Sequence, residues 1–326
     1  CLADLGLFDD ATSMLRATLI EGPLNEVVRP LPLYHVAYYT ARAGKDDTAT
    51  EWLHRAQTTC DDYVFPSQVD ALPILEYAIE RQPADARAHL YLGNLLAGLG
   101  RLDDAVRHWK QAVQQNQTLS VAFRNLGIDA WKRQGVLSDA VDWFRQGVVA
   151  RPSDQVMHRD LANVLIALGH RREAISLLKS MSPAPSLRND VTTVLARAYL
   201  DEHQCDESLD VLETTTYSNW EGDIDNWLVF VGAHVERGRE RLKHGDALLA
   251  LEDFEAALTY PKHLHVGRPS RPREAKALYW KGRALTALNR TSEARVAWQA
   301  GAAGAPMNEE QRDYISKCEE QLETES

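Results

Sequence analysis

Aromatic, acidic and histidine side chains come together in two turns, and these are the residue types that build sugar-binding subsites. Trp220-Glu221 follows one expected helix, and His263 lies in a loop after another. An aromatic ring can stack on a sugar face while a carboxylate and an imidazole hydrogen-bond the hydroxyls. In the alternative interpretation Trp220 packs at a helix junction and Glu221 begins the next helix. These three residues are secondary candidates for a binding site.

Metal binding and catalysis find little support in the sequence. His263-x-His265 has no neighbouring cysteine or carboxylate set to complete a metal site. The chain has no G-x-S-x-G, no P-loop and no G-x-G-x-x-G in a strand–turn–helix context. Acidic pairs such as Asp46-Asp47 and Asp103-Asp104 lie at expected helix starts, where they favour capping rather than acid–base work. We therefore expect no catalytic residue, no metal and no cofactor, and a chain that is not an enzyme.

The composition narrows the class of partner. The chain has 326 residues, of which 44% are hydrophobic and 25% charged, and its formal net charge is -11. An acidic chain is a poor ligand for nucleic acid, whose phosphates need clustered Lys and Arg. No apolar run approaches the roughly 18 residues of a membrane span. The four cysteines are far apart and form no C-x-x-C, as expected for reduced thiols. These features favour a cytoplasmic protein that binds neither nucleic acid nor a membrane.

A recurring spacing of small residues shows which elements must position the candidate side chains. A small residue is followed by a second after twelve positions and a third after seven more. The sets are Gly93–Ala105–Ala112, Ala37–Ala49–Ala56, Gly238–Ala250–Ala257 and Gly282–Ala294–Gly301. Gly93 and Gly127 are 34 residues apart, as are Ala162 and Ala196. A period near 34, with small residues where two helices cross, predicts stacked helical hairpins.

The clearest unit runs from about residue 86 to residue 118. Leu92, Leu95 and Leu96 share one face of its first helix, which Gly100 ends. Trp109 then faces inward from the second helix. Prolines such as Pro152 follow several second helices and separate one unit from the next.

These units resemble the tetratricopeptide repeat family. The motif residues are Tyr91-Leu92-Gly93, Ala105, Trp109 and Ala112, then Leu126-Gly127, Ala140, Phe144, Gly147 and Pro152, and finally Trp280-Lys281-Gly282, Ala294, Trp298 and Gly301. The resemblance implies an all-α, right-handed superhelical solenoid of about seven helical hairpins with irregular insertions. It also implies a concave groove, lined by the first helix of each hairpin, that binds a protein or peptide.

We expect a single solenoid over residues 1–326, as a fragment of a longer protein. Its parts are a partial repeat 1–22, repeats 30–63, 86–119, 120–153, 155–188, 189–222, 223–261 and 275–306, a half repeat 66–83, a loop 262–274 and a capping helix 308–322. Gly127 and Ala140 are 13 residues apart, one more than usual, which predicts a lengthened turn. Residues 223–244 are expected to form an unusually long helix.

The resemblance also places candidate binding residues on the concave face. Counting from the small residue as position eight gives Tyr91, Asn94, Arg124, Asn125, Trp131, Arg159, Asn163, Arg197, Tyr279 and Arg283. Arginine offers a planar fork of donors, and asparagine both donates and accepts, so together they suit a carboxylate, a phosphate or a sugar. Alternatively, these side chains bond one another between repeats.

A clamp for a peptide's terminal carboxylates is disfavoured. Repeat proteins with such a clamp resemble one another in having two asparagines and three cations at set positions. Here Asn94 and Asn125 match, but the cation positions hold Leu90, Val156 and Asp160. Asp160 would repel a carboxylate.

Arg124-Asn125-Leu126-Gly127, Trp220-Glu221-Gly222 and the Tyr260-Pro261 loop also resemble a narrower group of large bacterial proteins. That group joins an uncharacterised N-terminal β-rich domain to a tetratricopeptide array and is linked to carbohydrate metabolism. The preferred hypothesis is a scaffold whose groove binds a partner protein, a peptide or its own upstream domain. The alternatives are part of a carbohydrate-active enzyme and a structural dimerisation arm.

Overall fold

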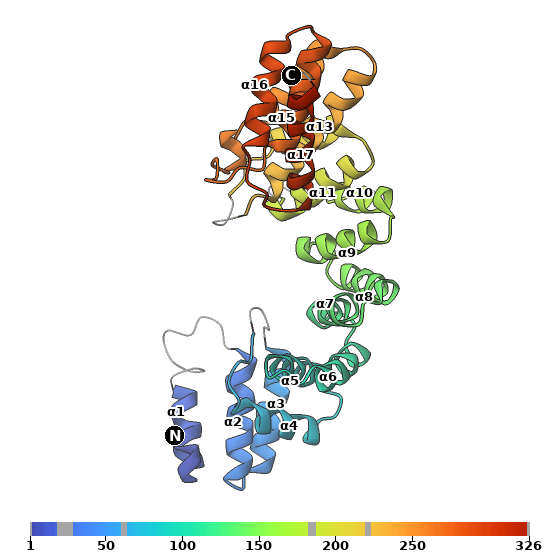
Figure 1. The fold of residues 1–326 in the computed structure, drawn as a ribbon. Helices are drawn as coiled ribbons and strands as arrows, with labels where there is room; N and C mark the ends of the chain where they lie inside the picture. Colours follow the sequence, from blue (N-terminus) through green and yellow to red (C-terminus); the bar gives the residue numbers. More distant parts are fainter. Residues whose placement is uncertain (1, 18–28, 60–63, 182–186, 219–222, 325–326) are drawn as a thin grey trace. The chain divides into compact units, whose positions relative to one another are not determined.

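The structure is a computed structural model that describes residues 2–17, 29–59, 64–181, 187–218 and 223–324. These ranges contain seventeen α-helices and no β-strand (Figure 1). The chain divides into two compact units, Cys1–Pro152 and Ser153–Ser326, called unit 1 and unit 2 below. The expectation of an all-α fold is confirmed.

Unit 1 holds three complete helical hairpins. After a 3₁₀ turn at Ala3–Leu5, its helices are α1 (Phe8–Leu15), α2 (Pro30–Arg42), α3 (Asp46–Thr58), α4 (Ala71–Arg81), α5 (Ala86–Gly98), α6 (Leu102–Gln115), α7 (Ser120–Ile128) and α8 (Leu137–Ala150). The hairpins are α2/α3, α5/α6 and α7/α8. Helix α1 packs on α2, while α4 packs on both α2 and α5.

Unit 2 holds four more hairpins and a final helix. Its helices are α9 (Gln155–Ala167), α10 (Arg171–Lys179), α11 (Asn189–Asp201), α12 (Cys205–Thr214), α13 (Asp225–Lys243), α14 (Ala247–Ala256), α15 (Ala275–Ala287), α16 (Thr291–Ala302) and α17 (Glu309–Thr324). Each hairpin packs on the next, and the first helices also contact one another. Helix α17 covers α15 and α16. The described residues thus form seven hairpins, three in unit 1 and four in unit 2, in agreement with the repeat pattern.

One residue in the turn of every described hairpin has a left-handed backbone. It is glycine in five hairpins, such as Gly100 with φ 78° and Gly245 with φ 89°, and His203 or Asn289 in the other two. Glycine adopts a positive φ without a Cβ clash, so it ends the first helix and lets the chain reverse. The predicted stop at Gly100 is confirmed.

The recurring small residue is where the two helices of a hairpin cross. A Cβ added to Gly93 would lie 2.6 Å from the Trp109 ring, and one added to Gly238 would lie 2.7 Å from the Phe254 ring. The same clash would arise between Gly127 and Phe144 and between Gly282 and Trp298. An aromatic ring therefore packs directly on the glycine backbone.

The remaining hairpins fill this crossing differently. Ala37, Ala162 and Ala196 take the place of the glycine, and a leucine follows sixteen residues later, as Leu53, Leu178 and Leu212. All six side chains are at most 1% exposed. Because protein interiors are close-packed, the two side chains at a crossing match in size: an aromatic ring packs on glycine, and the smaller leucine packs on alanine.

Two irregular stretches behave differently from each other. The predicted long helix is confirmed as α13, which has 19 residues. The predicted lengthening of the turn after Gly127 is wrong. The extra residue lies in a π-helical stretch, Asp129–Gln134, and Gly135 still makes the turn with φ 73°. A π-bulge takes up one residue inside a helix, so the turn keeps its length.

None of the helices in the described ranges combines the length and the apolar character that crossing a membrane would require.

Candidate functional site

Two of the predicted residues, Asn94 and Asn125, meet across neighbouring hairpins of unit 1. Asn94 Oδ1 accepts a hydrogen bond from Trp109 Nε1 at 2.9 Å and another from Asn125 Nδ2 at 2.8 Å. Trp109 is the ring that packs on Gly93, so the repeat core itself orients Asn94. The Nδ2 group of Asn94 has no acceptor among the described residues. The Asn94 amide is therefore held in place with a donor still available.

Asn94 and Tyr91 line a small cavity of about 170 Å³ between α5 and α7. Ser120 and Val121 at the start of α7 and Phe65 also line it. The remaining lining residues are Val64, Leu90, Thr118, Leu119, Ala150 and Arg151. We call this cavity the amide pocket, because the Asn94 side chain is fixed within it.

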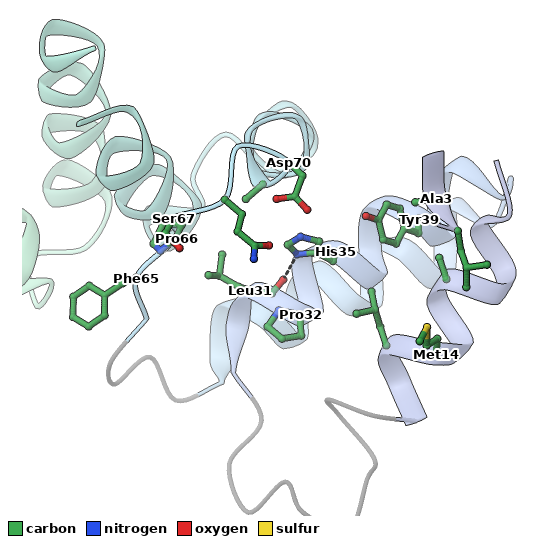
Figure 2. A pocket seen from close by; sticks show the side chains of 15 residues that line it. Ala3, Met14, Leu31, Pro32, His35, Tyr39, Phe65, Pro66, Ser67 and Asp70 are labelled. Atoms are coloured by element: carbon green, nitrogen blue, oxygen red, sulfur yellow. Dashed lines mark hydrogen bonds between the residues drawn. The ribbon is translucent and has the colours of Figure 1, made fainter. Parts of the chain in front are cut away.

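A larger cavity of about 420 Å³ lies beside α1 and α2 (Figure 2). Ala11, Met14 and Leu15 of α1 form one side, and Leu31, Pro32, His35 and Tyr39 of α2 another. The segment Phe65–Ala71 closes it through Phe65, Pro66, Ser67, Gln68, Asp70 and Ala71. Most of its wall is aliphatic, so we call it the apolar pocket.

Phe65 connects the two pockets. Its side chain is 72% exposed, yet it lines both the amide pocket and the apolar pocket. His35, Tyr91 and Asn125 each precede the small residue of their own hairpin by two positions. His35 and Tyr91 thus place equivalent positions of α2 and α5 in the walls of the apolar pocket and the amide pocket.

Sequence reasoning named Tyr91, Asn94 and Asn125 but missed the apolar pocket. The count that selected Tyr91 from Gly93 also selects His35 from Ala37. That signal was present in the chain. Met14, Phe65 and Asp70 carry no such signal, because they lie outside the regular hairpins.

Hydrogen bonds define the polar edge of the apolar pocket. His35 Nδ1 lies 2.8 Å from the Leu31 carbonyl, and because a carbonyl only accepts, Nδ1 donates its proton there. Burial, followed by the Asp70 carboxylate, raises the pKa of Tyr39 above its ordinary value. Asp70 therefore lies close enough to influence the pocket electrostatically.

The other predicted residues of unit 1 lie away from this pair of pockets. Trp131 lies in the π-helical stretch, with the Lys132 ammonium 3.3 Å from its ring centroid. Arg124 is half-buried on α7. Neither residue lines either pocket.

In unit 2 the predicted Arg159 is committed to ion pairs. Its Nε donates to Asp160 Oδ1 at 3.0 Å, and Nη1 pairs with Asp190. Burial opposes the charge, but the two carboxylates outweigh it and raise the pKa of Arg159. This is the alternative in which such side chains bond one another between repeats.

The remaining candidates of unit 2 are scattered. Tyr279 is 9% exposed, and its hydroxyl accepts from Arg283 Nη1 at 3.1 Å. Asn163 and Arg197 are half-buried on α9 and α11. A cavity of about 600 Å³ exists in unit 2, between the loop that carries Arg268 and Arg271 and the end of α16. None of the five predicted residues lines it.

The secondary candidates do not gather into a described site. Trp220 and Glu221 lie outside the described residues. The carbonyl of His263 accepts from the Tyr217 amide at 2.9 Å, and the next carbonyl, that of Leu264, accepts from Asn226 Nδ2 at 2.9 Å. These bonds fasten the loop to the segment that carries Tyr217 and to the start of α13. Within the part of the chain that the structure describes, no group of three or more His, Cys, Asp or Glu could hold a metal ion.

The repeat geometry agrees with a comparison against known families. The model described as "Tetratricopeptide repeat" matches residues 70–119, 93–155 and 235–310. The chain is a tetratricopeptide repeat protein. The match covers the crossing glycine and its aromatic partner in the hairpins α5/α6, α7/α8, α13/α14 and α15/α16. It does not separate the narrower carbohydrate-linked group from other tetratricopeptide repeat proteins.

Several solved structures are similar to this tetratricopeptide repeat protein at low identity. YrrB, described as a TPR protein with an unusual peptide-binding site, is 20% identical, with 56% of this chain and 90% of that chain covered and a TM-score of 0.45. Naa15/Naa10 bound to HypK-THB is 16% identical, with 89% of this chain and 39% of that chain covered and a TM-score of 0.49. The C-terminal part of a TPR repeat-containing protein from Cytophaga hutchinsonii is 13% identical, with 96% of each chain covered and a TM-score of 0.36. Likenesses this distant identify no ligand.

Proposed function

We propose that this tetratricopeptide repeat protein is a non-catalytic interaction scaffold, and that unit 1 holds an extended segment of a partner protein on the first helices of its hairpins. One observation carries the proposal. Two pockets share the exposed Phe65, and equivalent positions of α2 and α5, held by His35 and Tyr91, line them. An extended segment that passes Phe65 would place side chains in both pockets.

The amide pocket suits the backbone of such a segment. An extended chain offers a carbonyl and an amide at every residue, and both need partners when water is displaced. The Asn94 Nδ2 group donates to a carbonyl, while Trp109 and Asn125 hold the side chain in position. A donor fixed before binding loses little rotamer freedom on binding, which favours affinity.

The test begins with selection of twelve-residue peptides from a random library on the full chain. Selected peptides are then titrated against Val121→Glu and Val149→Glu by fluorescence anisotropy. Val121 lines the amide pocket and is 41% exposed, whereas Val149 on α8 is 80% exposed and lines neither pocket. A carboxylate at position 121 should weaken binding at least tenfold, and the control substitution should leave the affinity unchanged. Peptides that bind both variants as well as the wild type would rule out this surface.

A further inference from the structure

The wall of the apolar pocket is suited to a bulky aliphatic or aromatic side chain. Ala11, Met14 and Leu15 recur at helical spacing on α1, and Leu31 and Pro32 face them from α2. A volume of about 420 Å³ lies within the range of pockets that enclose specific ligands. Met14 is 59% exposed and flexible, so it can adjust to the shape of an entering side chain. Burying such a side chain would stabilise a complex through the hydrophobic effect.

The polar edge of the same pocket offers acceptors. Figure 2 shows the Asp70 side chain pointing toward His35, whose Nδ1 donates to the Leu31 carbonyl. Asp70 is exposed and immediately precedes α4, but its carboxylate makes no capping hydrogen bond to that helix. Gln68 and Ser67 supply both donors and acceptors. Among the described residues that line the pocket, Asp70 is the one Asp, Glu, Lys or Arg, so it gives the edge a negative charge.

From this arrangement we infer that the apolar pocket recognises a bulky apolar residue followed by lysine or arginine in the partner segment. The apolar side chain fills the pocket, and the cation donates to the Asp70 carboxylate at its edge. A charge-assisted hydrogen bond of this kind is stronger than a neutral one. The chain's net charge of -11 also attracts a basic segment at long range. The inference names the partner chemistry for the proposed function and rests on it.

Three fluorescein-labelled twelve-residue peptides test the inference against the full chain. They share a Gly-Ser-rich sequence and carry Leu-Leu-Lys-Arg, Leu-Leu-Glu-Glu or Ala-Ala-Lys-Arg at the centre. The first should bind at least tenfold more tightly than the other two, because only it satisfies both the apolar wall and the acidic edge. The Ala-Ala-Lys-Arg peptide controls for non-specific attraction to an acidic protein.

Two variants locate the binding. Asp70→Asn should weaken binding of the Leu-Leu-Lys-Arg peptide about tenfold, whereas Asp47→Asn, an exposed acid on α3 outside the pocket, should leave it unchanged. Met14→Lys should also weaken binding, because it places a charge in the aliphatic wall that the peptide's leucine contacts, with Val149→Lys as the matched control.

Equal binding of the three peptides, or an Asp70→Asn variant with wild-type affinity, would overturn the inference. The proposed function would survive that result if library peptides still lose affinity in Val121→Glu. If no defined peptide binds and no library peptide is sensitive to Val121→Glu, both proposals fail.

Discussion

The hairpins α5/α6 in unit 1 and α13/α14 in unit 2 cross in the same way but enclose different polar pairs. In α5/α6, His89 lies four residues before Gly93, and its Nδ1 is 3.0 Å from Nδ1 of His108. In α13/α14, His234 lies four residues before Gly238, and its Nδ1 is 3.0 Å from Oδ1 of Asp253. His108 and Asp253 each immediately precede the aromatic residue of the crossing. One position in the repeat thus holds two histidines in α5/α6, and a histidine with a carboxylate, called the charged pair below, in α13/α14.

The surroundings explain how the repeat accepts either pair. Burial lowers the pKa of both His89 and His108, which favours two neutral rings sharing one hydrogen bond. Asp253 is 2% exposed, and burial alone would raise its pKa. Hydrogen bonds from His234 and Arg237 outweigh burial and lower the pKa instead, with help from the Arg241 charge. A buried carboxylate is tolerated in α14 because the long helix α13 supplies its cations.

Removing the acceptor of the charged pair should have the largest effect. Asp253→Ala leaves His234, Arg237 and Arg241 beside one another without their shared carboxylate. We expect a loss of about 3–5 kcal/mol in the free energy of unfolding, as for other broken buried ion pairs. His108→Ala removes only a neutral partner and should cost about 1–3 kcal/mol. Urea unfolding of both variants compares them, and equal losses would contradict the distinction between the pairs.

The helix crossings should respond alike in the two hairpins. Gly93→Ala and Gly238→Ala each force a methyl group against a fixed ring, and overpacking of this kind costs about 1–3 kcal/mol. The double variant Gly238→Ala/Phe254→Leu recreates the alanine–leucine crossing seen with Ala162 and Leu178. It should therefore lose less stability than the two single variants added together. A double-mutant cycle measures this coupling, and strict additivity would show that glycine and the aromatic ring are not matched.

The turns offer a comparison in which no difference is expected. Gly100 and Gly245 both have a left-handed backbone with nothing within 4 Å of an added Cβ. Alanine should cost about 1–2 kcal/mol at either position, because only the backbone conformation is unfavourable. Thermal unfolding of Gly100→Ala and Gly245→Ala measures this. Unequal losses would mean that the two hairpins differ in more than their polar pairs.

The smallest expected effect is a response to pH that separates the two pairs. Because the pKa of His89 and His108 is lower in the folded protein than the roughly 6.5 of an unfolded chain, protonation favours unfolding. Their contribution is complete above about pH 6.5 and decreases as the pH falls below it. The pKa of Asp253 is also lowered, so its contribution persists down to about pH 4, the ordinary value of an aspartate, and is lost below that.

Urea midpoints at pH 7.5 and pH 5.5 test this difference. Wild type should be less stable at the lower pH, and His108→Gln should show a smaller change. Asp253→Asn should retain the wild-type pH response over this range, because Asp253 does not titrate there. If Asp253→Asn removed the pH response and His108→Gln preserved it, the response would come from α13/α14, which contradicts the prediction.

The regular parts of this fold were predictable because they depend on local sequence. Gly93 and Trp109 are near neighbours in one hairpin, and the turn at Gly100 needs only its own backbone. Contacts between repeats were harder to foresee. The residue types at Asn94 and Asn125 pointed to binding, but their mutual hydrogen bond depends on how two hairpins pack. The pairing of Arg159 with Asp190, 31 residues away, is of the same kind.

The apolar pocket could not be predicted from the repeat pattern. Phe65 and Asp70 belong to the irregular connection before α4, where the period of 34 is interrupted. A repeat count gives no position for such residues, and only the folded chain shows what they face.

The π-helical stretch Asp129–Gln134 has a practical consequence for engineering arrays of this kind. A single insertion there is absorbed without altering the turn at Gly135, so helix interiors, and not only loops, tolerate changes in length. Buried Asp129, hydrogen-bonded to Arg133 and Gln134, holds the widened turn together. Grafting this six-residue stretch into another first helix would rotate every side chain beyond it, and thereby re-aim a binding surface while the hairpin beneath stays intact.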